Sequence, residues 1–400
     1  MTAKRFITFV GICSIVATLI GCSGALSIAS GTVPAPSSEL TTVNGTVSNG
    51  GQFDIYGTGF GAKTQAAPIR YDDFETGTTV GDFVSADLPW WGTHFNSSGQ
   101  GAVIANDNLR TTNKTKDVKC MLSTNGNNTP LRSDSIYRDN VGFNITGKVY
   151  INFWQYMNLV GNANGTTDSS ANYQVKWMDL LRSPCNDCGG NTDNFEWQFS
   201  DWAYDSPPNP GWYEQTHIAN EDARITYFLS HNIFQASAWY NIAVQIDFGT
   251  LGSSNGSFYM YASQPSGAYF TLSKINIKTM FSAPPQGKTT YPDFLRLGWY
   301  HGSWYPVGPI KNTFTTYVYY DNIYIDNSWA RVEIGDQPTY DGCTHREIQI
   351  PVSWDSRHIV VKLNLGSFNS GNVYLYVIDE NGVVSNNGNG MLLTVGTNYH

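Results

Sequence analysis

Short segments of alternating apolar and polar residues, separated by clusters of Asn, Gly, Ser and Pro, run through this 400-residue chain. An alternation with a period of two is typical of a β-strand that buries one face. No stretch longer than ten residues has a convincing helical period. Aromatic residues, which fit strands well, make up 14% of the chain, and charged residues make up no more. The pattern therefore predicts an all-β protein with many turns.

The start of the chain has the layout of a bacterial export signal. Two basic residues at 4–5 precede an apolar run over 6–20, which is too short to span a bilayer comfortably. The run ends in LIGC at 19–22, which resembles a lipoprotein box. The resemblance implies cleavage before Cys22, acylation of this cysteine and, because Ser23 follows it, attachment to the outer membrane or cell surface. The alternative is a plain secretory signal with a secreted product.

Charge and composition restrict the partners of the exported chain. The formal net charge of the full chain is −9, and no basic patch interrupts it. Phosphate binding needs concentrated Lys and Arg, so nucleic acid is not an expected partner. A membrane is expected as a partner through the lipid anchor. After a signal peptide over 1–21, the small, polar segment 22–38 contains two prolines and predicts a flexible tether.

The two ends of the remaining chain resemble parts of one small domain. The stretch 39–64 contains two alternating strands and ends its second strand in YGTGFG at 56–61, which resembles the first hairpin of TIG/IPT immunoglobulin-like domains. Within 337–400, the segments WDS, IVVKL and YLYVIDENG resemble the back half of such a domain. We therefore interpret 39–64 and 337–400 as one sandwich that a large insertion splits. Two unrelated β modules at the chain ends are the alternative.

The insertion, residues 65–336, predicts a large antiparallel jelly roll. It opens with DDFE at 72–75 and closes with YDNIYIDN at 320–327. These segments, together with a hairpin formed by WYNIAVQID at 239–247 and GSFYMY at 256–261, resemble concanavalin A-like lectin/glucanase jelly rolls. The resemblance implies a protein that binds a polysaccharide or another glycan on a concave sheet.

Aromatic side chains stack on the apolar faces of sugar rings, so clustered aromatic residues are the candidates for glycan binding. Two loop-like clusters stand out in the sequence, and their members are Trp202, Trp212, Tyr213, Trp299, Tyr300, His301, Trp304 and Tyr305. Exposed aromatic patches usually mark recognition surfaces. The alternative is that these rings fill the core of a large sandwich, as strand aromatics commonly do.

Catalytic signatures are weak in this sequence. A glycosidase needs two carboxylates on one face, and Glu196 and Asp201, five positions apart, would point to opposite faces of a regular strand. A polysaccharide lyase needs a base and a group that neutralises a uronate; the residues that might assemble them are His217, Arg224, His231, Tyr300 and His301. The leading hypothesis is therefore a surface-anchored, non-catalytic carbohydrate-binding protein. A lyase or hydrolase with an atypical site is one alternative, and a structural or adhesion protein of the cell surface or matrix is another.

Calcium is the metal that this sequence favours. In jelly rolls of this class the first and last strands lie together, and an acid from each often shares a calcium ion. Asp73 and Glu75 would then meet Asp321 or Asp326. The alternative is that these acids cap turns and face solvent.

Four cysteines remain after Cys13 in the signal and Cys22 are set aside. They are Cys120, Cys185, Cys188 and Cys343. An even number in an oxidising compartment predicts two disulfides with three alternative pairings. A redox motif or a zinc site at Cys185 and Cys188 is the alternative.

Overall fold

The computed structural model describes residues 38–94, 101–106, 116–124, 130–160, 172–184, 196–204, 211–219, 225–228, 238–267, 269–280, 283–302 and 314–400. The predicted all-β class is confirmed, because these residues form antiparallel sheets. Their helices are short turns: α1 (Val84–Asp87), η1 (Phe143–Ile145), η2 (Tyr340–Gly342) and η3 (Ser385–Gly388). A helix of sufficient length and apolarity to cross a membrane does not occur in these segments. The export signal, the tether and Cys22 lie outside the described residues, as do nearly all positions before β1.

Two large sheets belong to the central part of the chain. The first is seven-stranded, in the order β13 (Ile225–Phe228), β12 (Gly211–Ala219), β11 (Glu196–Tyr204), β10 (Asn172–Arg182), β17 (Pro292–Gly302), β8 (Ser135–Arg138) and β4 (Gly92–His94). The second is nine-stranded, with β16 (Tyr269–Ile277), β15 (Gly256–Ser263), β14 (Trp239–Asp247), β9 (Lys148–Val160), β18 (Phe314–Asp326), β6 (Lys116–Thr124) and β5 (Val103–Asn106) in order, β3 (Arg70–Asp72) beside β18 and β7 (Pro130–Ser133) beside β6.

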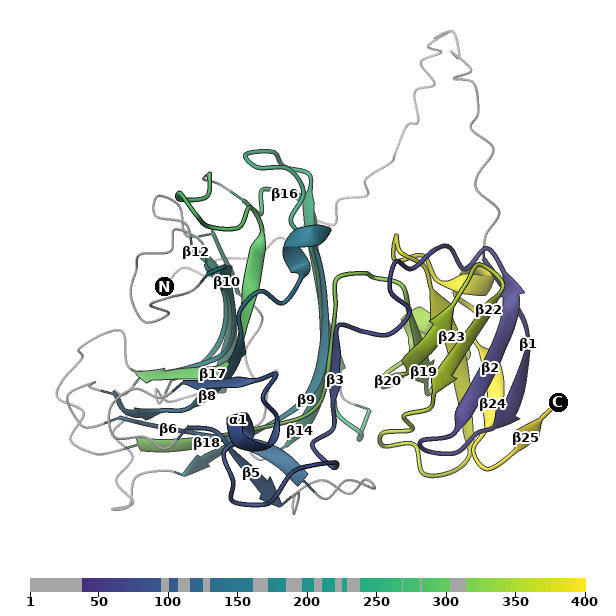
Figure 1. The fold of residues 1–400 in the computed structure, drawn as a ribbon, viewed down its shortest axis with the longest axis horizontal. Coiled ribbons are helices and arrows are strands. Elements are labelled where there is room, and N and C mark those ends of the chain that lie inside the picture. Colours follow the sequence, from purple (N-terminus) through teal and green to yellow (C-terminus); the bar gives the residue numbers. More distant parts are fainter. Residues whose placement is uncertain are drawn as a thin grey trace, which may run out of the picture. The chain divides into compact units, whose positions relative to one another are not determined.

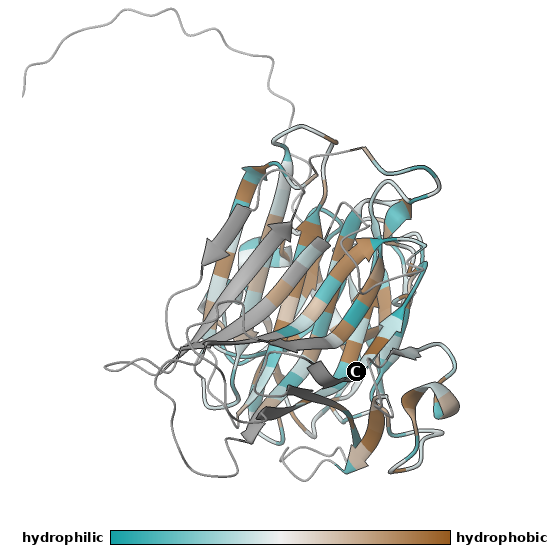
Figure 2. Ribbon diagram, turned by 90° about the vertical axis from the view of Figure 1, so that its left-hand side faces the viewer, coloured by the Kyte–Doolittle hydropathy of each residue, from teal (hydrophilic) through white to brown (hydrophobic). Residues whose placement is uncertain are grey.

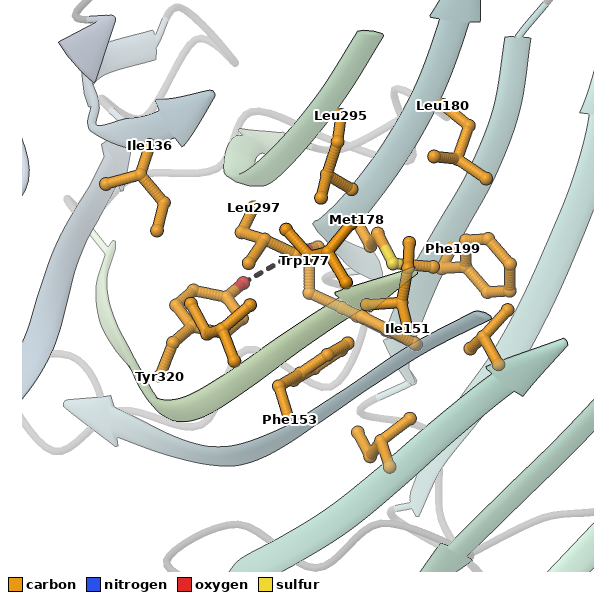
Figure 3. Packing of buried hydrophobic residues seen from close by; sticks show 14 of the residues in the cluster. Ile136, Ile151, Phe153, Trp177, Met178, Leu180, Phe199, Leu295, Leu297 and Tyr320 are labelled. Atoms are coloured by element: carbon orange, nitrogen blue, oxygen red, sulfur yellow. Dashed lines mark hydrogen bonds between the residues drawn. The ribbon is translucent and has the colours of Figure 1, made fainter. Parts of the chain in front are cut away.

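The inner faces of these two sheets form one aromatic-rich core. Met178 and Leu297 of the seven-stranded sheet pack toward Phe153 and Tyr320 of the nine-stranded sheet (Figure 3). The Tyr320 hydroxyl donates a hydrogen bond of 2.7 Å to the carbonyl oxygen of Trp177, so the one polar atom of this buried ring is satisfied. Apolar and polar residues alternate along the strands, which Figure 2 shows as alternating brown and teal. This alternation gives each sheet an apolar inner face.

The two ends of the described chain share a smaller sandwich. One of its sheets has the order β21 (Ile350–Trp354), β22 (His358–Lys362), β2 (Gln52–Thr58), β1 (Glu39–Thr46) and β25 (Asn398–Tyr399). The other has the order β20 (Arg346–Ile348), β19 (Arg331–Gly335), β23 (Asn372–Ile378) and β24 (Met391–Thr394). Ile55 of β2 is the register partner of Ile359 of β22, so residues about 300 positions apart are neighbours. Figure 1 shows the purple strands of the early chain beside the yellow strands of the late chain.

The core of the small sandwich is mainly aliphatic, and it extends further back along the chain than the sequence suggested. Val332 and Ile334 of β19 are fully buried in the same cluster as Phe53 and Val361. The predicted boundary at residue 337 is therefore too late, because β19 already pairs with β20 and β23. The turn at 327–330, directly after β18, is where the chain passes from one sandwich to the other.

The predicted proximity of the first and last strands of the insertion is also present. Asp72 of β3 is the register partner of Ile323 of β18.

Candidate functional site

Two charged residues interrupt the apolar pattern of neighbouring strands in the seven-stranded sheet. On β10, Asp179 lies between the core residues Met178 and Leu180, and on β17, Arg296 lies between Leu295 and Leu297. Asp179 and Arg296 are register partners. Since successive residues of a strand point to opposite faces, both lie on the face of this sheet that is turned away from the core. We call this face the front face.

Asp179 and Arg296 form a tight ion pair there. The Arg296 Nε and Nη2 atoms donate to Asp179 Oδ2 at 3.0 and 2.7 Å. Their side chains are only 0% and 1% exposed, so the pair is desolvated and each charge neutralises the other. A buried pair of this kind fixes geometry more than it adds stability. The pair therefore holds β10 and β17 in a fixed arrangement next to the neighbouring positions of the front face, and it adds no net charge there.

The strand register extends this position into a row across the whole sheet. From β13 to β4 the row consists of Thr226, His217, Gln198, Asp179, Arg296, Tyr137 and Gly92. A Cβ atom added to Gly92 would lie 2.4 Å from the Tyr137 ring, so only glycine permits this ring position. The Tyr137 ring also stacks on Phe294 at a centroid distance of 5.4 Å. The row thus combines hydrogen-bonding residue types with one fixed, partly exposed aromatic ring.

A bulge in β10 creates the next two rows. The register shifts between Lys176 and Met178, so Trp177 and Met178 are both in the core. Lys176 consequently falls on the front face, in the row Phe228, Gln215, Ser200, Lys176 and Tyr300. The row beyond it consists of Tyr213, Trp202, Gln174 and Gly302.

The register separates the predicted glycan-binding residues into groups. Trp202, Tyr213 and Tyr300 take front-face positions. Trp212 and His301 occupy the alternate positions, as partners of Ala203 and Val175 respectively. Trp299 belongs to β17, which ends at Gly302, before Trp304 and Tyr305; these two lie outside the described residues.

Of the residues considered for catalysis, His217 has a front-face register position and Arg224 and His231 lie outside the described residues. Lys176, Asp179 and Arg296 were missed by the sequence analysis. The signal was present, since KWMDLLR and FLRLG each place a charge inside an apolar strand.

The predicted calcium ligands do not converge. Asp326 pairs with Lys63 at 2.5 Å and accepts a hydrogen bond from the Tyr324 hydroxyl at 3.0 Å. Glu75 accepts one from the backbone N–H of Lys116 at 3.1 Å. Asp321 and Asp73 accept from the backbone N–H groups of Asn322 and Glu75. Within the described ranges there is no group of three or more His, Cys, Asp or Glu side chains that could hold a metal ion.

Burial affects the Lys63–Asp326 pair in a consistent way. Desolvation lowers the pKa of Lys63 and raises the pKa of Asp326, and the attraction between the two partners opposes both shifts. The pair thus ties the segment after β2 to the end of β18.

The predicted disulfides are not found among the described cysteines. Cys120 and Cys343 are buried thiols. They belong to separate clusters, the jelly-roll core and a small aromatic cluster with Tyr376, so a bond between them is not formed. Burial raises the pKa of the Cys343 thiol, which keeps it protonated. Cys185 and Cys188 lie outside the described residues.

Comparisons with known proteins add a resemblance in fold. A scan against protein-family models finds no match, and a search of curated proteins finds none either. Among solved structures, the chain is similar to the marine PL-14 alginate lyase from Aplysia kurodai, with 9% identity and a TM-score of 0.44 over 65% of this chain and 99% of that one. It is also similar to the alginate lyase Aly36B, with 10% identity and a TM-score of 0.39 over 64% of this chain and 94% of that one.

A third similar structure is the binding domain of botulinum neurotoxin serotype C1, with 10% identity and a TM-score of 0.36 over 82% of this chain and 73% of that one. Similarities with TM-scores of 0.44 and below do not show what this chain binds or catalyses.

Proposed function

We propose that this protein is a surface-anchored glycan-binding protein whose binding surface is the front face of the jelly roll. The observation that supports the proposal is the composition of three adjacent rows of that face. They combine the aromatic types of Trp202, Tyr213 and Tyr300 with hydrogen-bonding types such as Gln174 and Lys176. Aromatic rings bind the apolar face of a sugar, and polar groups beside them read its hydroxyls.

The buried Asp179–Arg296 pair has a supporting role in this proposal. Because its charges cancel and its side chains are covered, it does not itself offer a cation to a sugar acid. Lys176 is the partly exposed cation of the described front face and is the group that would meet a carboxylate. The pair keeps β10 and β17 in register beneath Lys176 and Tyr300.

A second candidate function, cleavage of an acidic polysaccharide by β-elimination, is favoured by one observation. Lys176 and Tyr300 are register partners, and His217 occupies the neighbouring row. In such an elimination a base removes the proton next to the sugar carboxylate while an acid protonates the departing glycosidic oxygen. A Tyr or His can supply the base, and Lys176 can offset the carboxylate charge.

One experiment separates the two functions. Purified protein is incubated with immobilised alginate and with a neutral β-glucan, and both retention and ultraviolet absorbance are followed. Retention without new absorbance supports binding, whereas new unsaturated ends identify a lyase. The variant Trp202→Ala should be retained more weakly, and Tyr56→Ala, in the small sandwich, is the matched control. Equal retention of both variants would reject the front face as the binding surface.

The membrane anchor is a separate part of the proposal. Acylation of Cys22 would attach the chain to the outer membrane or cell surface, and the small sandwich would act as a stem for the jelly roll. Labelled fatty acid should appear on the wild-type protein and be lost in Cys22→Ser. Label that persists on the variant would refute the anchor.

A further inference from the structure

The face of the nine-stranded sheet that is turned away from the core carries a fully buried charged cluster. We call it the back face. Tyr150 of β9, Asn241 of β14 and Tyr261 of β15 lie there, and all three are at most 2% exposed. The residues that cover them come from the small sandwich, mainly from β19, η2 and β20. The back face is therefore the contact surface between jelly roll and sandwich.

Two arginines and one glutamate of the small sandwich form the centre of this contact. Arg331 Nε lies 2.5 Å from Glu333 Oε1, and Arg346 Nε lies 3.7 Å from Glu333 Oε2. The three side chains are only 5% to 6% exposed. The jelly roll supplies the next partner, because the Tyr150 hydroxyl donates to Glu333 Oε1 at 2.9 Å.

Aromatic rings from both sides enclose the arginines. The Arg346 guanidinium lies 3.9 Å from the ring centre of Tyr261, in the jelly roll, and 4.0 Å from that of Tyr340, in the sandwich. Arg331 lies 4.5 Å from the ring centre of Tyr150. Cation–π contacts of this kind are strongest where the cation is desolvated. Each arginine is thus held by groups of both domains.

Hydrogen bonds from the same arginines also cross the boundary. Arg346 Nη2 donates to the Tyr259 hydroxyl at 3.2 Å, and Arg331 Nη1 donates to Gln245 Oε1 at 3.3 Å. The cavity enclosed by this cluster offers only about 10 Å³ of space, enough for about one water molecule. The cluster therefore leaves room for little more than one water molecule.

A second polar group flanks the first. Glu347 accepts hydrogen bonds from Trp154 Nε1 at 3.2 Å and Asn241 Nδ2 at 3.3 Å, both from the jelly roll. His345 shares a hydrogen bond of 3.0 Å with Ser263 Oγ, also from the jelly roll. Ser263, His345 and Glu347 resemble a catalytic triad in connectivity, but Ser263 is 0% exposed and unreachable for a substrate. Their position indicates a structural link between the two domains.

We propose that this buried ion cluster is an interlock that makes the jelly roll and the small sandwich unfold as one cooperative unit. If the sandwich separated alone, Tyr150 and Tyr261 would leave Glu333 and Arg346, and each charge would lose partners that only the other domain provides. The three ions would stay together in the sandwich, so separation would cost the hydrogen bonds and cation–π contacts that the jelly roll supplies. The domains are joined by this side-chain cluster in addition to the two chain crossings near Lys63 and Trp329.

The full chain tests the proposal through heat and hydrogen exchange. The wild type should show one calorimetric transition, and amides of β23 in the sandwich should exchange with the same global protection as amides of β14 in the jelly roll. In Glu333→Gln the transition should split, and β23 amides should exchange on the order of tenfold faster than β14 amides. Two transitions in the wild type, or a single transition in a folded Glu333→Gln, would overturn the interlock.

Two further variants serve as controls for this test. Asp179→Asn makes the same change in a buried ion pair that is internal to the jelly roll, so it should lower the transition temperature without splitting the transition. Tyr150→Phe removes a single cross-domain hydroxyl and keeps the ring. It therefore tests the coupling of the two domains if Glu333→Gln does not fold. A faster exchange of β23 relative to β14 in Tyr150→Phe supports the interlock, and equal exchange refutes it.

Discussion

The front and back faces of the jelly roll have similar compositions but differ in how far the rest of the chain covers them. Both interrupt their apolar strands with tyrosine, tryptophan and amide or charged side chains. On the back face, Trp154 and Tyr261 are 0% and 2% exposed, because the small sandwich of the same chain covers them. On the front face, Tyr137 and Lys176 remain partly exposed. Aromatic and polar residues on a sheet therefore do not identify a ligand surface until the rest of the chain is placed.

Charge distribution distinguishes the two faces more clearly than aromatic content. Both members of the front-face ion pair, Asp179 and Arg296, belong to the jelly roll. The back-face charges also belong to one sheet, that of β19 and β20, but Tyr150, Tyr259 and Gln245 of the jelly roll contact them. Contacts that two domains share suit a permanent interface between them.

The largest expected effect is the loss of the shared carboxylate. Glu333→Ala leaves Arg331 and Arg346 buried without their acid, and should lower the free energy of unfolding by about 3 to 5 kcal/mol. Asp179→Ala removes the acid from one arginine instead of two and should cost less. Urea unfolding of both variants measures the difference. A larger cost for Asp179→Ala would reverse the ranking of the two faces.

Acidity should weaken the back face in a defined range. Burial alone would raise the pKa of Glu333, but the charges of Arg331 and Arg346 outweigh it and lower the pKa from 4.5 to about 2. A carboxyl with a depressed folded-state pKa contributes stability that is present above pH 4.5 and is lost as the pH falls toward 2. The contribution is roughly 3 kcal/mol.

Acid titration of the unfolding free energy checks this expectation. The difference in stability between wild type and Glu333→Gln should shrink as the pH falls through the same window. A constant difference between pH 5 and about pH 2 would show that Glu333 does not titrate with a depressed pKa.

The sequence was sufficient for the class of the fold and for several of its neighbours. Period-two alternation predicted the strands, and the segments around Ile55 and Ile359 do lie side by side. The local sequence pattern did not predict features that depend on tertiary structure. The bulge after Lys176 changes which later residues share a face, and nothing in the alternation of KWMDLLR announces it.

The candidate site was less predictable than the fold for the same reason. Trp202 and Trp212 look equivalent in sequence, but their register positions alternate. One of the expected calcium ligands, Asp326, pairs instead with Lys63, which comes from more than 250 residues earlier. Likewise, the sequence does not single out Arg331, Glu333 and Arg346, because their role depends on tyrosines of another domain. Sequence reveals residue types, whereas a site needs the long-range partner.

A reciprocal pair of substitutions sharpens the comparison of the faces. Trp202→Ala should weaken binding of alginate or another retained glycan about tenfold and change stability little, since it removes one stacking position. Tyr150→Ala should do the opposite, because Tyr150 is 2% exposed and contacts Glu333 and Arg331. Binding isotherms and urea unfolding on the same preparations provide both readouts. Loss of binding in a folded Tyr150→Ala would link the faces instead of separating them.

The smallest effect is expected where a carboxylate and its hydrogen-bond partner are partly exposed. His358 Nε2 lies 2.8 Å from Asp54 Oδ1 on the small sandwich, with side chains 35% and 23% exposed, and His358 stacks on Tyr56 at a centroid distance of 4.5 Å. Water screens such a pair, so Asp54→Asn should change the unfolding free energy by less than about 1 kcal/mol. The stacked rings remain in the variant and keep the register of β2 and β22. A cost as large as that of Glu333→Ala would mean that burial does not set the strength of these contacts, and the comparison of buried and exposed pairs would lose its physical basis.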